Sequence, residues 1–300
     1  IHTIGLRSFQ SIMAWLVSKK TKTPLISTDQ GGLTTHPFLK ESGLFFKIVY
    51  KIQDHFIKSV LKHSSIVCAA NEYEKQIFSD LYSEANVEII RNGINLKSLI
   101  SKKNFKEKYK IKSNFVLFVG RFSKSKGIDV LIEAINIIKN DLTKLNTRLV
   151  IMGVDFGYQN EMIETIDKLA LSEHIIIIKN PPREDVISSY GESQFLILPS
   201  VWELSPLVPL ESFAFKKPVI STNSHGIPFT VQHNKTGILV EPDNPNELAD
   251  AIKKLLNEPD LIEKLGLEGY NFVKNECNCI SMATNILKLY EKALENNEIK

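Results

Sequence analysis

The sequence predicts an α/β protein with parallel sheets, organised as two doubly wound domains. Apolar runs of strand length alternate with segments of helix length along most of the chain. Several of these runs, such as Phe195–Leu198, are continuously apolar, as in parallel strands that helices cover on both faces. The chain of 300 residues also reaches the size, about 250–300 residues, at which a single hydrophobic core usually gives way to two domains.

The alternation is most regular from about residue 107 onward. The expected strands there are Phe115–Val119, Arg148–Met152, His174–Ile178, Phe195–Leu198, Pro218–Thr222 and Gly237–Val240. The expected helices are Ile128–Lys139, Glu161–Leu171, Arg183–Tyr190, Pro206 to about Phe215, Pro245–Leu256, Leu261–Val273 and Ser281–Glu295.

The first part of the chain follows the same pattern. Expected strands are the strand end Ile1-His2 and the segments Thr23–Ser27, Ser65–Ala70 and Val87–Ile90; expected helices are Ser8–Lys19, Leu44–His63 and Glu72–Leu81. Asn92-Gly93 is a turn signal that marks the domain edge. We therefore expect an N-terminal domain over residues 1–95, a C-terminal domain over 96–280, and a helix over 281–300 that packs back toward the N-terminal domain. Because Ile1-His2 has the character of a strand end, we expect the N-terminal domain to be incomplete.

Composition excludes several classes of protein. The net charge of +3 is too small to indicate a nucleic-acid-binding protein, and no apolar run reaches the ~18 residues of a membrane span. Three cysteines give no disulfide framework, which is typical of a reducing compartment, and we expect a cytoplasmic protein. Cys277-x-Cys279 has no second pair or nearby histidine that would complete a metal site.

The segment from Glu203 to Glu211 is the first candidate site, because it lies where a buried strand passes into a helix. Ligands of open α/β sheets bind at such carboxyl ends. Pro206 suits the first helical position, so the amides of Leu207 and Val208 would be available to an anion. Glu203 before the helix and Glu211 within it would then flank a ligand that carries both phosphates and hydroxyls. A charged loop followed by an ordinary amphipathic helix is the alternative.

The turn after the first strand of the C-terminal domain is the second candidate. Between Gly120 and Gly127 it carries Arg121, Lys124 and Lys126, but it matches neither Gly-x-Gly-x-x-Gly nor a P-loop. Arginine and lysine at the carboxyl end of a strand suit phosphate groups. A solvated basic loop is the alternative.

The predicted helix 44–63 is amphipathic and basic. Its apolar positions include Phe45, Val49, Ile52, Phe56 and Val60, with lysines among them. Such a helix can lie on a membrane surface. More often the apolar stripe covers a sheet and the lysines face water, and we favour that interpretation.

Taken in order, these segments match a known family. Gly120-Arg121 with Lys126-Gly127, Pro199-Ser200 with Glu203 and Glu211, Pro218–Thr222 and Gly237–Val240 resemble the C-terminal domain of family 4 glycosyltransferases of the GT-B fold. Asn92-Gly93-Ile94-Asn95 resembles the interdomain Asn-Gly-Ile-Asp of that family. The resemblance covers about residues 95–295 and implies two Rossmann-like domains.

The resemblance also implies transfer of a sugar from a nucleotide-diphosphate-sugar donor, with retention at the anomeric carbon. By the same resemblance, Arg121 and Lys126 would hold the diphosphate and offset charge on the leaving group, and Glu203 would contact the donor sugar near the reaction centre. The amides of Leu207 and Val208 would cap the phosphates, and Glu211 would accept from the ribose hydroxyls. The implied catalytic residues are Glu203, Arg121 and Lys126, and the implied donor-binding residues are Gly120, Arg121, Lys126, Glu203, Ser205, Leu207, Val208 and Glu211. No Asp-x-Asp occurs, so we expect no metal and no cofactor.

The sequence departs from the family pattern at two places. His225 and Phe229 replace a glycine and a glutamate of the family after the Pro218–Thr222 strand. In the N-terminal domain Gln30 stands where the family usually has a histidine, and His36 is the nearest imidazole. We assign Gln30, Gly31 and His36 to the acceptor side.

The expected partners are a nucleotide-sugar donor and a glycan or lipid-linked acceptor, with no nucleic acid. Peripheral contact with the inner face of a membrane through residues 44–63 is a further expectation. Three alternative classes stay open: a nucleotide-sugar-binding remnant without turnover, a nucleotide-sugar epimerase of the same fold, and a membrane-surface module. Because the N-terminal domain is expected to be partial, we predict that the chain binds nucleotide diphosphate through residues 121–211 but transfers sugar poorly or not at all.

Overall fold

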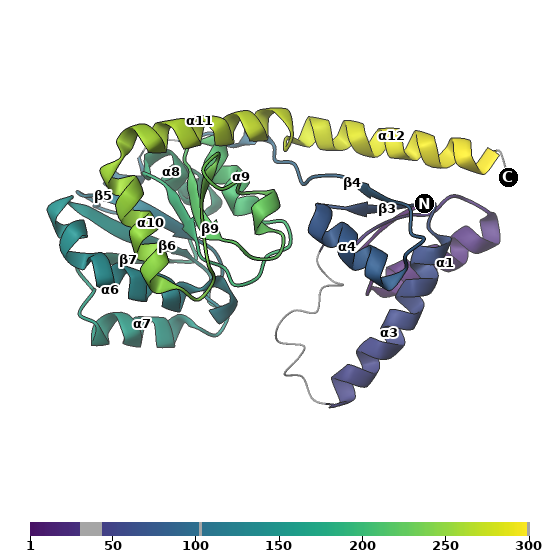
Figure 1. Ribbon diagram of the computed structural model, residues 1–300, viewed down its shortest axis with the longest axis horizontal. Helices are drawn as coiled ribbons and strands as arrows, with labels where there is room; N and C mark the ends of the chain where they lie inside the picture. Colours follow the sequence, from purple (N-terminus) through teal and green to yellow (C-terminus); the bar gives the residue numbers. More distant parts are fainter. Residues whose placement is uncertain (31–43, 102–103, 299–300) are drawn as a thin grey trace. The chain divides into compact units, whose positions relative to one another are not determined.

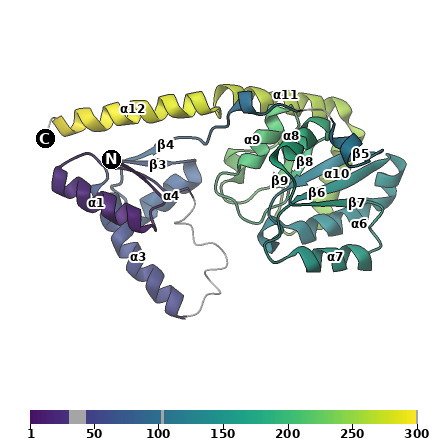
Figure 2. The same ribbon diagram turned by 180° about the vertical axis from the view of Figure 1, so that it is seen from behind.

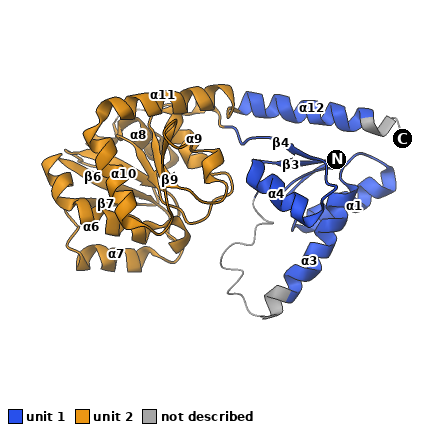
Figure 3. Ribbon diagram, viewed as in Figure 1, with its two compact units in different colours: residues 1–93, 279–300 blue, residues 94–278 orange. Residues whose placement is uncertain are grey.

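The computed structural model describes residues 1–30, 44–101 and 104–298 (Figure 1). The chain divides into two compact units, unit 1 with residues 1–93 and 279–300, and unit 2 with residues 94–278 (Figure 3). Each unit has its own parallel sheet with helices between the strands. The prediction of an α/β protein with parallel sheets is therefore confirmed.

The sheet of unit 2 has the strand order β10-β9-β8-β5-β6-β7, with all neighbours parallel. Its strands are β5 (Asn114–Val119), β6 (Thr147–Gly153), β7 (Ile175–Lys179), β8 (Leu196–Leu198), β9 (Val219–Thr222) and β10 (Gly237–Val240). The chain runs outward from β5 to β6 and β7, then returns to place β8 on the other side of β5 (Figure 2). The strand order therefore reverses between β5 and β8, and this is the point where open α/β sheets bind ligands.

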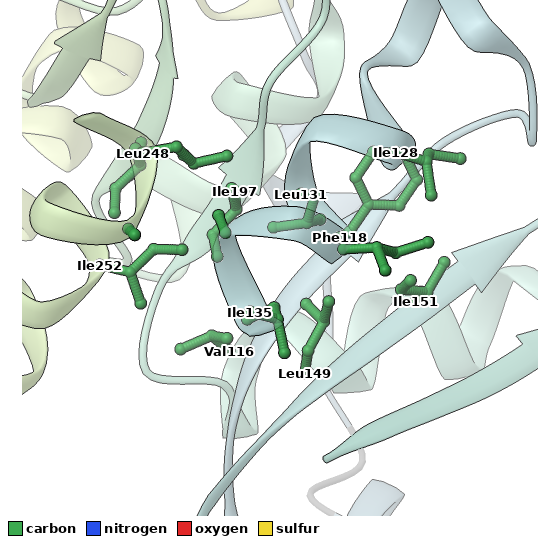
Figure 4. Close-up of a cluster of buried hydrophobic side chains, with 14 of the residues drawn as sticks. Val116, Phe118, Ile128, Leu131, Ile135, Leu149, Ile151, Ile197, Leu248 and Ile252 are labelled. Atoms are coloured by element: carbon green, nitrogen blue, oxygen red, sulfur yellow. The ribbon is translucent and has the colours of Figure 1, made fainter. Parts of the chain in front are cut away.

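Helices cover both faces of this sheet. They are α5 (Phe105–Lys108), α6 (Ile128–Lys144), α7 (Gln159–Lys168), α8 (Arg183–Glu192), α9 (Leu207–Ala214), α10 (Pro245–Asn257) and α11 (Pro259–Asn275). Alternate residues of β5 point to opposite faces: Val116 and Phe118 pack with α6 and α10 (Figure 4), whereas Phe115 and Leu117 pack with α8, α9 and α11. This double coverage explains why the strands are mostly apolar on both faces.

In the described part of unit 1, four parallel strands follow the order β1-β2-β3-β4. They are β1 (His2–Ile4), β2 (Ile26–Thr28), β3 (Ile66–Ala69) and β4 (Val87–Ile89). The helices α1 (Phe9–Thr21), α3 (Leu44–His63) and α4 (Glu72–Leu81) connect them and share one core, to which Leu25, Val67 and Phe78 contribute. The long helix α12 (Cys279–Glu298) contributes Leu289 and Ala293 to a second cluster with Ile26, Ile66 and Cys68 of the strands.

The predicted elements lie within a few residues of the observed ones, with one correction that concerns the candidate site. Pro206 is the N-cap of α9, with φ −68° and ψ 133°, and the helix begins at Leu207. The expectation that Pro206 is the first helical residue was therefore wrong, because the fixed φ of proline is compatible with an extended ψ as well as a helical one. Pro209 then lies in the first turn, as expected. The short helix α5 was not predicted.

Among the described residues, no helix combines the length and hydropathy that crossing a membrane requires.

Candidate functional site

Two loops meet at the carboxyl ends of β5 and β8, where the strand order reverses. The β5 loop, residues 120–127, and the β8 loop, residues 199–206, are joined by a hydrogen bond from the Val201 amide to the Ser125 carbonyl, 3.0 Å long. Gly127 adopts a left-handed φ of 63°, and a Cβ there would lie 2.1 Å from the Pro199 carbonyl oxygen. Only glycine allows the two loops to approach this closely.

An ion pair between Lys126 and Glu203 connects the same two loops. Lys126 Nζ donates to Glu203 Oε1, and Ser200 Oγ donates to the same oxygen over 3.1 Å. Both charged side chains are largely buried, with 12% and 14% of their surface exposed. The family resemblance implies that Lys126 binds the diphosphate and Glu203 the sugar. The structure places the two groups in contact, so a ligand that reaches one also reaches the other.

A third loop, which follows β9, is hydrogen-bonded to the β8 loop on either side of Trp202. The Gly226 amide donates to the Glu203 carbonyl over 3.0 Å, and Ser224 Oγ donates to the Val201 carbonyl over 2.7 Å. His225, at a left-handed φ of 51°, lies beside Trp202 and shares a hydrogen bond with Ser224. Burial lowers the pKa of His225, so its ring is neutral at neutral pH. The departure from the family pattern at His225 therefore places an imidazole next to the β8 loop.

Arg121 differs from Lys126, although both lie in the β5 loop. It is exposed, and its guanidinium carbon lies 4.9 Å from the centre of the Phe156 ring. Gly120, which precedes it, has its carbonyl oxygen 1.8 Å from where a Cβ of Gly153 would be, so the backbones after β5 and β6 are also closely packed. The loop thus holds Lys126 fixed against a largely buried carboxylate, whereas Arg121 and Lys124 lie at the surface, where Lys124 pairs with Glu161 over 3.1 Å.

The start of α9 is the next component of the site. Leu207 is 46% exposed, whereas Pro209 and Leu210 are buried. The amides of the first turn of an α-helix have no partner within the helix, and Pro206 has no side chain that could cap them. Leu207 and Val208 therefore present donors at the helix N-terminus, and Ser205 adds a half-buried hydroxyl just before it.

Glu211 lies within α9, and its carboxylate accepts hydrogen bonds from two side chains of α8. Arg183 donates to both of its carboxylate oxygens, and Tyr190 Oη donates to Oε2 over 2.9 Å. Tyr190 is fully buried, and burial together with the Glu211 charge raises the pKa of its hydroxyl well above the usual value. Hydrogen bonds to Glu211 raise the pKa of Arg183. The Arg183 side chain is 57% exposed, whereas that of Glu211 is only 12% exposed.

Sequence reasoning did not identify Arg183 and Tyr190 as part of the site. One signal could have found them: Pro181-Pro182-Arg183 stands after β7, at the same edge of the sheet as the β5 and β8 loops. Both residues lie on α8, which packs next to α9 on one face of the sheet.

The acceptor-side prediction falls mainly outside the described residues. Gly31 and His36 lie there. Gln30 is exposed, has a left-handed φ of 59°, and follows β2 of unit 1 after the buried Asp29, whose carboxylate accepts from the Leu6 amide. Gln30 lines a small pocket in unit 1 together with Thr28, Glu74 and Asn92.

Within the described part of the chain, no group of three or more His, Cys, Asp or Glu side chains has the geometry to hold a metal ion. Cys277 and Cys279 are free thiols.

Comparison with known proteins identifies the family. Residues 101–272, which form more than half of the chain and most of unit 2, match the sequence profile of glycosyl transferases group 1. The chain belongs to this family. The matched range contains every residue named above for the β5 loop, the β8 loop and α9. The resemblance read from the sequence is thereby confirmed.

Individual relatives extend the match into unit 1. An uncharacterised glycosyltransferase of Methanocaldococcus jannaschii is 28% identical over 290 residues, which cover 94% of this chain and 72% of the relative. The capsular polysaccharide biosynthesis glycosyltransferase CapM of Staphylococcus aureus is 27% identical over 267 residues, 82% of this chain and 68% of CapM. Both relatives are longer than this chain.

The solved structures establish the fold. The structure of HepE from Anabaena in complex with UDP superimposes with a TM-score of 0.81 at 18% identity, covering 94% of this chain and 76% of HepE. Such similarity over both units confirms the GT-B fold expected from the sequence.

Proposed function

We propose that the chain transfers a sugar from a nucleotide-diphosphate-sugar donor to a saccharide or lipid-linked acceptor, with retention at the anomeric carbon. The observation that carries this proposal is the Lys126–Glu203 ion pair at the point where the strand order of unit 2 reverses. Membership of a glycosyltransferase family gives the class of reaction. HepE, which shares the fold, was solved with UDP, which supports a nucleotide as part of the donor.

The donor would bind in unit 2 with its diphosphate at the start of α9. The amides of Leu207 and Val208 and the charges of Lys126 and Arg121 would surround the phosphate oxygens, since helix N-termini and cations stabilise such groups. Arg121 is exposed in the β5 loop and can turn toward a ligand. Lys126 is already fixed by Glu203. These positive groups would offset the negative charge that develops on the departing diphosphate.

Glu203 would contact the hydroxyls of the transferred sugar. One of its oxygens accepts from Lys126 and Ser200, which fixes the carboxylate in position. A fixed carboxylate can accept from sugar hydroxyls and can stabilise positive charge on the anomeric carbon in the transition state. In the transfer, the bond from the anomeric carbon to the phosphate oxygen breaks and a bond to the acceptor hydroxyl oxygen forms. The proton of that hydroxyl leaves with the diphosphate or to solvent.

Glu211 would bind the nucleoside. The two carboxylate oxygens offer about four acceptor positions, of which Arg183 and Tyr190 use three. Ribose hydroxyls would therefore replace Arg183, which is the more exposed partner, while Tyr190 stays in place. On unit 1, Gln30 would contribute to the acceptor side, as the sequence predicts.

The test is incubation with a panel of nucleotide sugars, with and without saccharide acceptors, followed by measurement of released nucleotide diphosphate. The proposal predicts release that depends on one class of donor and increases with an acceptor, and a product of unchanged anomeric configuration by NMR. Glu133→Gln, which removes an exposed carboxylate from α6, is the matched control for Glu203→Gln. Donor binding without any release would favour a binding protein, and inversion of the anomeric centre would contradict the retaining mechanism.

A further inference from the structure

The loop after β9 carries a histidine at a fixed place beside the β8 loop. Ser224 Oγ donates to the Val201 carbonyl over 2.7 Å, and the Gly226 amide donates to the Glu203 carbonyl over 3.0 Å. These two hydrogen bonds join residues on either side of His225 to residues on either side of position 202. The backbone therefore fixes the point from which the imidazole of His225 projects.

The imidazole itself is held by two neighbours although His225 is exposed. Its Nδ1 shares a hydrogen bond with Ser224 Oγ. The centre of the ring lies 6.3 Å from that of the half-buried Trp202, and the two ring planes are tilted by 60°. A polar side chain that is exposed to a ligand but already ordered loses little further freedom when the ligand binds. His225 is therefore preorganised for a contact with a bound molecule.

The backbone conformation at His225 does not explain the choice of histidine. Its φ of 51° is left-handed. Glycine, which the family has at this position, adopts such a φ freely, whereas a residue with a Cβ adopts it with some strain. The exchange of glycine for histidine adds an imidazole without any benefit to the local backbone. A side chain kept at a strained position points to a role for the side chain itself.

The position of His225 in unit 2 places it beside the transferred sugar of the proposed donor complex. In that complex the diphosphate lies at the start of α9 and the sugar reaches Glu203, so the sugar lies over the β8 loop. The strand order β9-β8-β5 puts this loop between the β9 loop and the β5 loop. Lys126 holds Glu203 from the β5 side, whereas His225 and Trp202 stand toward the β9 side. The sugar would therefore meet His225 on the side away from Lys126.

The charges around this position suit an uncharged sugar. Partial burial of the ring lowers the pKa of His225, so the imidazole is neutral at neutral pH and offers one donor and one acceptor nitrogen. Sugar hydroxyls both donate and accept, and they can pair with either nitrogen. The carboxylate of a uronic acid would be repelled by Glu203, whose own positive partner is Lys126.

We propose that His225, supported by Trp202, forms the wall of the donor-sugar subsite on the β9 side and selects an uncharged sugar through a hydrogen bond to one of its hydroxyls. Trp202 would offer part of its apolar ring to the carbon-bound hydrogens of the same sugar. His225 is thus a specificity-determining residue that a glycine could not replace. This inference rests on the proposed function, because its ligand is the nucleotide sugar.

The test is calorimetry with two ligands that differ only in the sugar. One is the nucleotide diphosphate, and the other is the nucleotide sugar that the panel selects, with a methylene group in place of the glycosidic oxygen so that it is not cleaved. His225→Gly should weaken binding of the sugar analogue about 3- to 10-fold, as expected for one hydrogen bond. Affinity for the diphosphate and the melting temperature should stay nearly unchanged, because glycine tolerates the left-handed φ.

Deoxy forms of the analogue, each without one hydroxyl, locate the contact. Loss of the hydroxyl that His225 contacts should weaken binding to the parent chain but not to His225→Gly, whereas loss of a hydroxyl that Glu203 contacts should weaken both. His225→Gln should recover part of the affinity, because its amide also donates and accepts hydrogen bonds. His55→Gln, which changes an exposed histidine on α3 of unit 1, is the matched control.

Each result decides for or against the inference. Equal affinity of His225→Gly and the parent chain for the analogue would overturn it and leave the proposed function intact. A loss of diphosphate affinity as large as that of the analogue would also overturn it, since His225 would then act on the phosphates or on the loop. Selection of a uronic acid donor by the parent chain would contradict the uncharged sugar. Absence of binding to every nucleotide sugar would contradict the proposed function, and this inference with it.

Discussion

The two glutamates that flank the start of α9 each hold a cation, but in different surroundings. Lys126 and Glu203 are both largely buried, with 12% and 14% of their side-chain surface exposed. Arg183 is 57% exposed, whereas its partner Glu211 is 12% exposed. Glu203 shares its ion pair with Ser200 from its own loop, and Glu211 shares its ion pair with the buried Tyr190.

This difference separates a fixed pair from a replaceable one. A buried charge that loses its partner is costly, because neither water nor another group compensates it. The exposed guanidinium of Arg183 can return to water, and Glu211 would then keep the hydrogen bond from Tyr190 and gain hydrogen bonds from the ribose hydroxyls. We therefore expect Lys126–Glu203 to persist when the donor binds, and Arg183 to leave Glu211. The four predictions below and the final measurement test this distinction.

The largest effect is expected for sugar transfer by Glu203→Gln. The amide keeps the shape of the side chain but cannot stabilise positive charge on the anomeric carbon, so the transfer rate should fall about 100-fold or more. The measurement is nucleotide diphosphate release with the donor and acceptor found in the panel, in parallel with Glu133→Gln. A rate equal to that of the parent chain would remove Glu203 from the reaction.

Lys126→Met should affect both binding and stability. It removes a charge-assisted contact to the diphosphate worth about 1.5–3 kcal/mol, or roughly a 10- to 150-fold loss of affinity. It also leaves Glu203 without its buried partner, so the melting temperature should fall. Calorimetry and thermal melts measure the two effects. Adding Glu203→Gln should restore the melting temperature but not the affinity, and recovery of both would mean that Lys126 acts only on the fold.

Arg121→Ala separates binding from stability within the same loop. Arg121 is exposed and contacts the Phe156 ring rather than a carboxylate. Its loss should weaken nucleotide diphosphate binding by up to the same 1.5–3 kcal/mol and leave the melting temperature unchanged. A stable variant with full affinity would show that the diphosphate is held by Lys126 and the helix start without Arg121.

Arg183→Gln should have the smallest effect. Glu211 is largely buried but keeps the hydrogen bond from Tyr190, so the loss of stability should be small. The donor would no longer have to displace the guanidinium from Glu211. Nucleotide affinity should therefore stay the same or increase slightly, most visibly at low salt, where the competing ion pair is strongest. A tenfold loss of affinity in calorimetry would contradict this and would make Arg183 a ligand of the nucleotide.

Most strands, helices and site loops of unit 2 could be predicted from the sequence, because their signals are local. Continuous apolar runs such as Phe195–Leu198 are typical of parallel strands that are covered on both faces. The position of the 120–127 and 203–211 segments after such runs indicated the loops at the sheet edge. Predicted helix ends were close to the observed ones where the sequence has a residue that commonly caps helices. An example is Asn71 before α4, whose side chain accepts from the Glu74 amide.

Contacts between distant segments could not be predicted. Lys126 and Glu203 are far apart in sequence, and both resembled ligand-binding residues, so their pairing depends on how closely Gly127 lets the loops approach. Arg183 and Tyr190 lie on a helix whose pattern gives no sign of Glu211.

The most direct test compares nucleotide diphosphate binding by Glu203→Gln and Glu211→Gln, using the diphosphate that the nucleotide-sugar panel selects. Glu211 would accept from the ribose, which every donor carries, whereas Glu203 would contact only the transferred sugar. Calorimetry should therefore show a loss of about 1.5–3 kcal/mol in binding free energy for Glu211→Gln and nearly unchanged binding for Glu203→Gln. Loss of affinity in Glu203→Gln with full affinity in Glu211→Gln would contradict the assignment of the two glutamates.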